Sequence, residues 1–151
     1  MSCLRIIQDE AAMLAQGASL ADCFPGQGVI YLRGDLGAGK STLARGFIRA
    51  MGFAGPVKSP TYTLIEPYEI AGKTVYHLDL YRLSDPEELE FIGIRDIQGG
   101  NAICLVEWPE KGQGILPEPD IDILIKYLGE GREVSIGTGR PEFKAIINRL
   151  C

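Results

Sequence analysis

The chain has 151 residues, of which 46% are hydrophobic and 23% are charged, and its formal net charge is -5. These values are ordinary for a soluble globular protein and exclude a disordered tail, a fibrous repeat and a second large domain. The excess of acidic residues excludes a protein that holds nucleic acid by general attraction to phosphates. Any RNA contact is therefore expected to be local or shared with a partner.

The four cysteines, Cys3, Cys23, Cys104 and Cys151, lie far apart and form no CxxC pair. This spacing indicates neither a zinc site nor a disulfide framework, and we expect reduced thiols. No stretch approaches the about 18 consecutive apolar residues of a membrane helix, and the first residues lack the charged-then-apolar order of a secretion signal. The sequence thus predicts a cytoplasmic protein without a membrane segment.

The first third of the chain predicts an edge strand, a helix and a buried strand. The edge strand covers residues 4–7, and Asp9 caps a helix that extends to about Leu20. A strand at 29–32 is followed by a glycine-rich turn and by an amphipathic helix over about 40–51. Strand, glycine-rich loop and helix follow one another as they do around a phosphate-binding loop.

The rest of the chain mixes strands and helices. After an irregular loop at 52–60, the pattern predicts a hairpin of 61–70 with 74–81 and a helix over 85–92. The later elements are a strand at 102–106 that is buried on both faces, a hairpin of 121–128 with 133–136, and a closing helix at 141–150. We therefore expect an α/β fold with a parallel centre and antiparallel additions.

Residues 34–42 read GDLGAGKST, which fits the phosphate-loop pattern of glycine, four residues, glycine, lysine and a hydroxyl residue. Glycines allow main-chain amides to curve around phosphate oxygens, and the following helix points the positive end of its dipole at the same anion. An ordinary glycine-rich turn is the alternative. The candidate phosphate-binding residues are Gly34, Asp35, Leu36, Gly37, Ala38, Gly39, Lys40, Ser41 and Thr42. Lys40 supplies a cation, Ser41 a hydroxyl for Mg²⁺, and Thr42 an inner-phosphate contact.

Two carboxylates are candidates for the metal and for the attacking water. Asp79 lies in an apolar and aromatic strand, where a buried charge is costly unless it is paired or near a metal. Pairing with Arg82 or His77 is the alternative. Glu107 ends the most hydrophobic run, and in parallel sheets that end faces the ligand crevice. An ordinary exposed acid is the alternative there.

Three further side chains, at positions 61, 77 and 108, have both a structural and a functional interpretation. Trp108 could stack on a purine, although a core or interface role is equally typical of tryptophan. Thr61 could reach the metal or the terminal phosphate from a switch-like loop, or it could be a plain turn residue. His77 is expected to be a packed or hydrogen-bonded strand residue and not a catalyst.

With these residues, the chain resembles the TsaE (YjeE) family, the small P-loop ATPases of bacterial tRNA threonylcarbamoyladenosine synthesis. The resemblance spans nearly the whole length. Beside the loop it is carried by SPTYTL at 59–64, HLDLYRL at 77–83, ELEFIGI at 88–94, VEWPEKG at 106–112 and LPE at 116–118. The family usually has threonine where Ser41 stands, which keeps the hydroxyl.

The resemblance implies one P-loop ATPase domain over residues 1–151, with a three-layer P-loop NTPase-like fold, a central mostly parallel sheet and antiparallel flanking strands. It implies ATP and Mg²⁺ as ligands, with Lys40 on the phosphates, Ser41 and Asp79 on the metal, Glu107 on the metal or the attacking water, Trp108 near the adenine and Thr61 in a switch-like loop. Its implied partners are TsaB and TsaD proteins, which modify adenosine 37 of ANN-decoding tRNAs. ATP hydrolysis would reset that complex, and tRNA contact would be indirect or shared.

Two other functions fit the phosphate loop. A small-molecule or nucleoside kinase needs a substrate pocket and usually an arginine-rich lid, and the sequence has no arginine-dense segment. A nucleotide-gated binding module without useful turnover would use Glu107 only to hold Mg²⁺. The leading hypothesis is a slow, partner-dependent ATPase.

Overall fold

The computed structural model describes the backbone of residues 1–151 and the side chains of all residues except 98 and 99. The strands are β1 (Ser2–Ile7), β2 (Gly28–Gly34), β3 (Ile65–Ile70), β4 (Lys73–Asp79), β5 (Ala102–Glu107), β6 (Ile121–Leu128) and β7 (Gly131–Gly137). The helices are α1 (Glu10–Cys23), α2 (Lys40–Ala50), α3 (Glu88–Phe91), α4 (Ile94–Gly99) and α5 (Lys144–Leu150), with 3-10 turns η1 (Pro109–Gly112) and η2 (Pro141–Phe143).

One mixed sheet holds the seven strands in the order β1-β7-β6-β2-β5-β4-β3. The inner strands β6, β2, β5 and β4 are parallel, and β3, β7 and β1 pair antiparallel at the two sides. This is the α/β fold that the sequence predicts. In the register, Glu107 pairs with Leu32 on one side and with Asp79 on the other. The strand ends that carry the candidate site therefore meet at one edge of the sheet.

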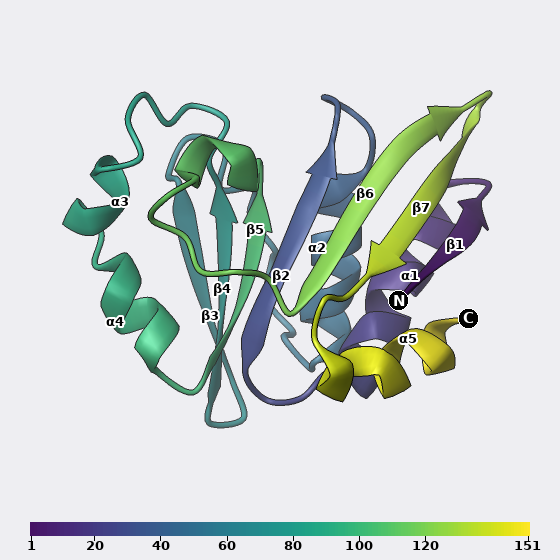
Figure 1. Cartoon of the computed structure of the whole chain (residues 1–151), viewed down its shortest axis with the longest axis horizontal. Coiled ribbons are helices and arrows are strands. Elements are labelled where there is room, and N and C mark those ends of the chain that lie inside the picture. Colours follow the sequence, from purple (N-terminus) through teal and green to yellow (C-terminus); the bar gives the residue numbers. More distant parts are fainter.

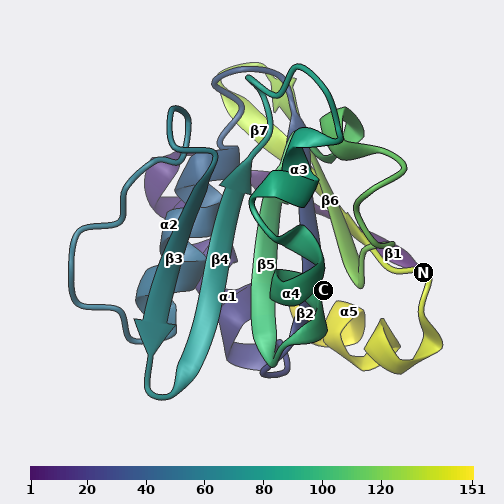
Figure 2. The ribbon, with the colours of Figure 1, turned by 90° about the vertical axis from the view of Figure 1, so that its left-hand side faces the viewer.

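Helices cover both faces of the sheet, as Figures 1 and 2 show. On one face, α1, α2 and α5 contribute to a core cluster that includes Leu20, Ile30, Phe47, Leu105 and Ile147. On the other face, α3 and α4 pack near β4 and β5 over a second cluster that includes Leu78, Leu89, Ile94 and Val106. None of the helices in the described part of the chain has the length and hydrophobicity to span a membrane.

The predicted start of the first helix is confirmed by its cap. Asp9 is extended, and its Oδ1 accepts a hydrogen bond from the Ala12 amide at 2.8 Å. α1 lies very close to α2, because a Cβ atom added at Gly17 would be 2.1 Å from the backbone oxygen of Leu43. This close packing fixes the position of α2 and of the loop that precedes it.

The segment before β3 differs from the predicted strand at 61–70. Leu64 has a left-handed φ of 71°, and its amide donates to Pro60 O at 2.8 Å. These features form a turn that keeps Thr61 out of the hairpin, so the strand begins only at Ile65. The turn holds Thr61 beside the end of β4 instead of carrying it along the edge strand.

The predicted helix over 85–92 is also shorter than expected. The Asp85 carboxylate accepts a hydrogen bond from the Glu87 amide and its backbone oxygen accepts one from the Glu88 amide, so residues 85–87 form a turn. The Ser84 side chain caps no helix, contrary to the sequence pattern. Gly93, with a φ of 74°, ends α3 and starts a second short helix, α4. The closing segment likewise begins as the 3-10 turn η2 before α5.

The expectation that the thiols are all reduced is wrong for two of them. Cys3 and Cys151 are joined by a disulfide, with their Cα atoms 6.3 Å apart, whereas Cys23 and Cys104 are free. The two cysteines are 148 positions apart in the sequence, and spacing rules detect only local patterns. They meet because α5 returns to β1, where the Arg5 guanidinium also donates to Leu150 O at 2.8 Å.

We expect reduction of this disulfide to lower the free energy of unfolding by about 2–4 kcal/mol, because the bond restricts the unfolded chain. Urea unfolding with and without a reductant measures the change, and Cys3→Ser should match the reduced wild type. The Cys23→Ser variant, which alters a free cysteine, should respond to the reductant as the wild type does. Equal midpoints with and without reductant would contradict the expectation.

Candidate functional site

The loop between β2 and α2 has the backbone shape of an anion site. Gly39, the residue before α2, has a φ of 120°, which side-chain-bearing residues rarely adopt. Gly34 has a φ of 151°, and a Cβ atom there would lie 2.7 Å from the backbone oxygen of Ile125. The amides of the first turn of α2 have no partner inside the helix, so they are available to an anion.

Lys40 is held inside this loop. Its Nζ donates to the backbone oxygens of Gly34 and Asp35 and lies 4.2 Å from the centre of the Trp108 ring. Burial lowers the pKa of the Lys40 ammonium, while the nearby Glu107 carboxylate acts in the opposite direction. A desolvated ammonium held by carbonyl oxygens can exchange these partners for phosphate oxygens.

Ser41 and Glu107 are in direct contact at the start of α2. The Ser41 hydroxyl lies 2.9 Å from Oε2 and 3.1 Å from Oε1 of Glu107, whose side chain is buried. Because an ionised carboxylate only accepts hydrogen bonds, the hydroxyl donates and keeps its lone pairs free. The alternative of an ordinary exposed acid at position 107 is therefore wrong.

Asp79 is buried at the end of β4 and forms no ion pair within the described residues. Its carboxylate accepts from the Tyr81 amide at 3.0 Å and from the Thr61 hydroxyl at 3.4 Å. Burial raises the pKa of Asp79, the Tyr81 amide lowers it, and the adjacent Glu107 raises it further. Neither Arg82 nor His77 pairs with it, and a cation would favour its charged form.

The sequence-derived candidates surround one cavity of about 370 Å³. Its lining includes the loop residues Leu36, Gly37, Ala38, Gly39, Lys40, Ser41 and Thr42, together with Thr61, Asp79, Glu107 and Trp108. Gly34 and Asp35 do not line it, but their backbone oxygens hold Lys40. The structure thus brings together groups from the loop, from two strand ends and from the turn at Thr61.

Trp108 lies at the Lys40 end of the cavity. Its backbone has a left-handed φ of 57°, and its ring is tilted against Tyr81 with centroids 5.1 Å apart. The ring therefore lies on the cavity wall beside the Lys40 ammonium.

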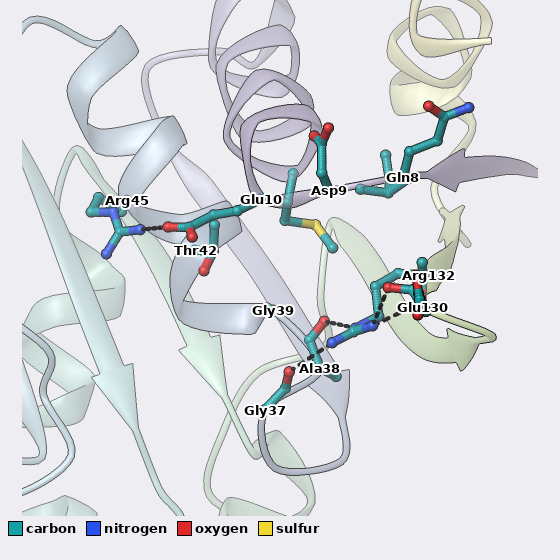
Figure 3. A pocket seen from close by; sticks show the side chains of 13 residues that line it. Gln8, Asp9, Glu10, Gly37, Ala38, Gly39, Thr42, Arg45, Glu130 and Arg132 are labelled. Atoms are coloured by element: carbon teal, nitrogen blue, oxygen red, sulfur yellow. Dashed lines mark hydrogen bonds and ion pairs between the residues drawn. The ribbon is translucent and has the colours of Figure 1, made fainter.

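A second cavity, of about 350 Å³, lies on the other side of the same loop, beside the first turn of α1. Figure 3 shows Arg132 reaching toward the loop from the β6–β7 side of this cavity. Its Nε donates to Ala38 O at 2.9 Å and one terminal nitrogen donates to Gly37 O at 3.3 Å. Thr42 lines both cavities, so the phosphate loop separates two spaces that share its residues.

Two features of the site are not among the sequence-derived candidates. Arg132 and Tyr127 brace the loop, the latter by donating to Leu36 O at 2.7 Å, and no local pattern points to them. His77 lies 2.6 Å from Glu107. Its spacing from Asp79 does carry a signal, because residues two apart on a strand share one face.

Comparisons with known proteins point to one family. The sequence model of the family described as "Threonylcarbamoyl adenosine biosynthesis protein TsaE" matches residues 7–134. The Haemophilus influenzae protein named "tRNA threonylcarbamoyladenosine biosynthesis protein TsaE" is 53% identical over 140 residues, covering 89% of each chain. The Bacillus subtilis protein of that name is 36% identical over 151 residues, covering 97% of this chain and 89% of that protein. The crystal structure of Bacillus subtilis YdiB matches with a TM-score of 0.85 and 26% identity, covering 99% of this chain and 94% of that one.

Proposed function

The chain belongs to the TsaE family, and from this premise we propose that it binds and hydrolyses ATP as a subunit of the bacterial tRNA threonylcarbamoyladenosine machinery. One observation carries the proposal: Lys40, Ser41, Asp79 and Glu107 line a single cavity at the start of α2. A phosphate loop alone indicates only phosphate binding. A loop facing two buried carboxylates has the groups that hydrolysis of a phosphoanhydride needs.

Each of these groups has a distinct role in the proposed reaction. The loop amides and Lys40 bind the phosphate chain and stabilise the charge that develops on the transferred phosphoryl group. Glu107 orients the attacking water and accepts its proton, because its carboxylate is buried at the cavity wall. Thr61, linked to Asp79 through its hydroxyl, belongs to a turn that adjusts to the terminal phosphate.

The residues present fit a magnesium ion. No group of three or more His, Cys, Asp or Glu side chains in the described residues could hold a metal by itself. Mg²⁺ does not require such a group, because it keeps several waters and takes one or two protein oxygens together with substrate phosphates. Ser41 and Asp79, with Glu107 close by, supply oxygen ligands of this kind. The ion would neutralise charge on the outer phosphates.

The two cavities suggest how the nucleotide lies across the loop. Its outer phosphates would occupy the cavity of Lys40 and Glu107, and Thr42 would contact the inner phosphate between the cavities. The nucleoside would then lie in the second cavity, beside Asp9 and Arg132 (Figure 3). We propose this placement of Trp108 at the phosphate end as the alternative to the adenine contact that the resemblance implies.

Trp108 is the only tryptophan of the chain, so its fluorescence reports on this site alone. We expect Mg-ATP to change the emission, because phosphate oxygens draw the Lys40 ammonium away from the indole ring. Magnesium tripolyphosphate should produce a similar change, and adenosine should produce none. An equal response to adenosine, or no response to saturating Mg-ATP, would contradict the placement of Trp108.

The proposed partners follow from the family and from the acidic net charge of the chain. The relatives are named for threonylcarbamoyladenosine biosynthesis, and this small acidic chain has little general attraction for tRNA. We propose that TsaB-type and TsaD-type proteins carry the tRNA and the transfer chemistry, and that ATP hydrolysis by this chain resets their complex. tRNA contact would then be indirect or shared, and turnover by the isolated chain slow.

Phosphate release tests this proposal, measured with the chain alone and with purified TsaB-type and TsaD-type proteins. We expect slow release by the chain alone, faster release with both partners, and retention of the TsaD-type protein on the immobilised chain when ATP is present. Transfer of phosphate to an added metabolite would instead indicate a kinase. Tight ATP binding without phosphate release under either condition would indicate a nucleotide-gated module.

A further inference from the structure

His77 is the one histidine of the chain and lies on β4, two residues before Asp79. The residue is 1% exposed, and Nε2 lies 2.6 Å from Oε2 of Glu107. This is the shortest hydrogen bond to Glu107, because the Ser41 hydroxyl lies at 2.9 and 3.1 Å from the two carboxylate oxygens. Glu107 is therefore held from α2 on one side and from β4 on the other.

The surroundings of the ring indicate which nitrogen carries the hydrogen. The Glu107 carboxylate already accepts from Ser41, and as an acceptor it requires a donor at Nε2 of His77. Nδ1 is buried and has no hydrogen-bond partner among the described residues. The contacts therefore place a hydrogen on Nε2.

We propose that His77 is a positioning residue for Glu107. Its Nε2–H group holds Oε2, so that Oε1, whose partner is the Ser41 hydroxyl at 3.1 Å, is the oxygen presented to the attacking water. A glutamate has three side-chain torsions, and one contact from Ser41 does not fix them all. The second contact orients the carboxylate before the nucleotide binds. Hydrogen bonds from neighbouring residues orient the ligands of metal sites in the same way. This inference rests on the proposed ATPase function for its kinetic part only.

Two substitutions at His77 separate positioning from simple core packing. His77→Gln keeps an N–H donor near the position of Nε2, whereas His77→Leu fills the space without a donor. We expect His77→Leu to lower kcat by about 10- to 100-fold while KM for ATP changes little, because a misplaced carboxylate affects the chemical step. His77→Gln should recover most of the lost rate. Equal kcat values for His77→Leu and the wild type, or no recovery in His77→Gln, would overturn the proposal.

Val75 provides the matched control. It is fully buried on the same strand and face as His77, yet it belongs to the apolar core and makes no hydrogen bond to the site. Val75→Ala should lower the melting temperature by creating a cavity and leave kcat near the wild-type value. A loss of kcat in Val75→Ala as large as in His77→Leu would assign the effect to general destabilisation and overturn the positioning role.

A spectroscopic measurement tests the contact without any turnover. Because the chain has a single histidine, ¹⁵N-histidine labelling of untagged protein gives signals from His77 alone. We expect Nε2 to carry a hydrogen and its signal to shift in Glu107→Gln. The opposite tautomer, or a signal unaffected by that substitution, would overturn the inference. If the wild type releases no phosphate, the proposed function fails, while this measurement still decides whether His77 holds Glu107.

Discussion

Replacing Lys40 by alanine is expected to weaken binding of Mg-ATP about 100-fold or more and to abolish measurable turnover. A hydrogen bond to a charged group contributes up to about 3 kcal/mol, and each 1.4 kcal/mol is about a factor of ten in affinity. Lys40 has two carbonyl partners in the free protein, so phosphate oxygens replace bonds that already orient its ammonium. Calorimetric titration with Mg-ATP measures the affinity directly.

Lys73 offers a matched control for this substitution. It is the first residue of β4, is exposed and does not line the loop cavity. Lys73→Ala removes the same charge from the chain and should bind Mg-ATP as the wild type does. Near-normal affinity and rate in Lys40→Ala would refute the assignment of residues 34–42 as the phosphate cradle.

Glu107→Gln is expected to slow phosphate release by about two orders of magnitude or more while ATP binding is largely kept. A general base contributes about 100- to 10,000-fold to such a rate, and glutamine keeps the shape of the side chain but cannot accept the proton. A neutral side chain also reduces the repulsion between positions 79 and 107, so a lower affinity for ATP is not expected. Single-turnover rates and separately measured affinities distinguish the chemical step from binding.

Glu110 serves as the control for the charge change. It lies in η1, three residues after Glu107, with its carboxylate 3.6 Å from the Arg33 guanidinium and partly exposed. Glu110→Gln removes the same charge outside the cavity and should retain the wild-type rate. If Glu107→Gln released phosphate at the wild-type rate, Glu107 would have no role in activating water and would at most contribute to metal binding.

Local chemistry explains which parts of this fold can be predicted from the sequence. The glycines and the lysine at 34–42 act through backbone conformation and helix geometry, which depend on neighbouring residues only. The Asp9 cap, the apolar strand at 102–106 and the hairpin of β6 with β7 depend on similarly short-range patterns and are confirmed. Asp79 and Glu107 stand out because each charge interrupts an apolar strand.

The features that could not be predicted depend on the order of strands in the sheet. Arg132 reaches the loop because β6 lies beside β2, and Cys3 meets Cys151 because α5 returns to the edge strand. The contact between His77 and Glu107 requires β4 and β5 to be neighbours in one particular register. Such pairings join residues that are 30 to 148 positions apart, beyond the range of any local pattern.

A crystal structure of the protein with Mg²⁺ and a non-hydrolysable ATP analogue would show directly whether residues 34–42 bind phosphate. We expect phosphates on the amides of residues 37–42, Lys40 released from Gly34 and Asp35, and the terminal phosphate beside Glu107. A loop that stays free of phosphate at saturating analogue, with Lys40 still bound to those backbone oxygens, would contradict it.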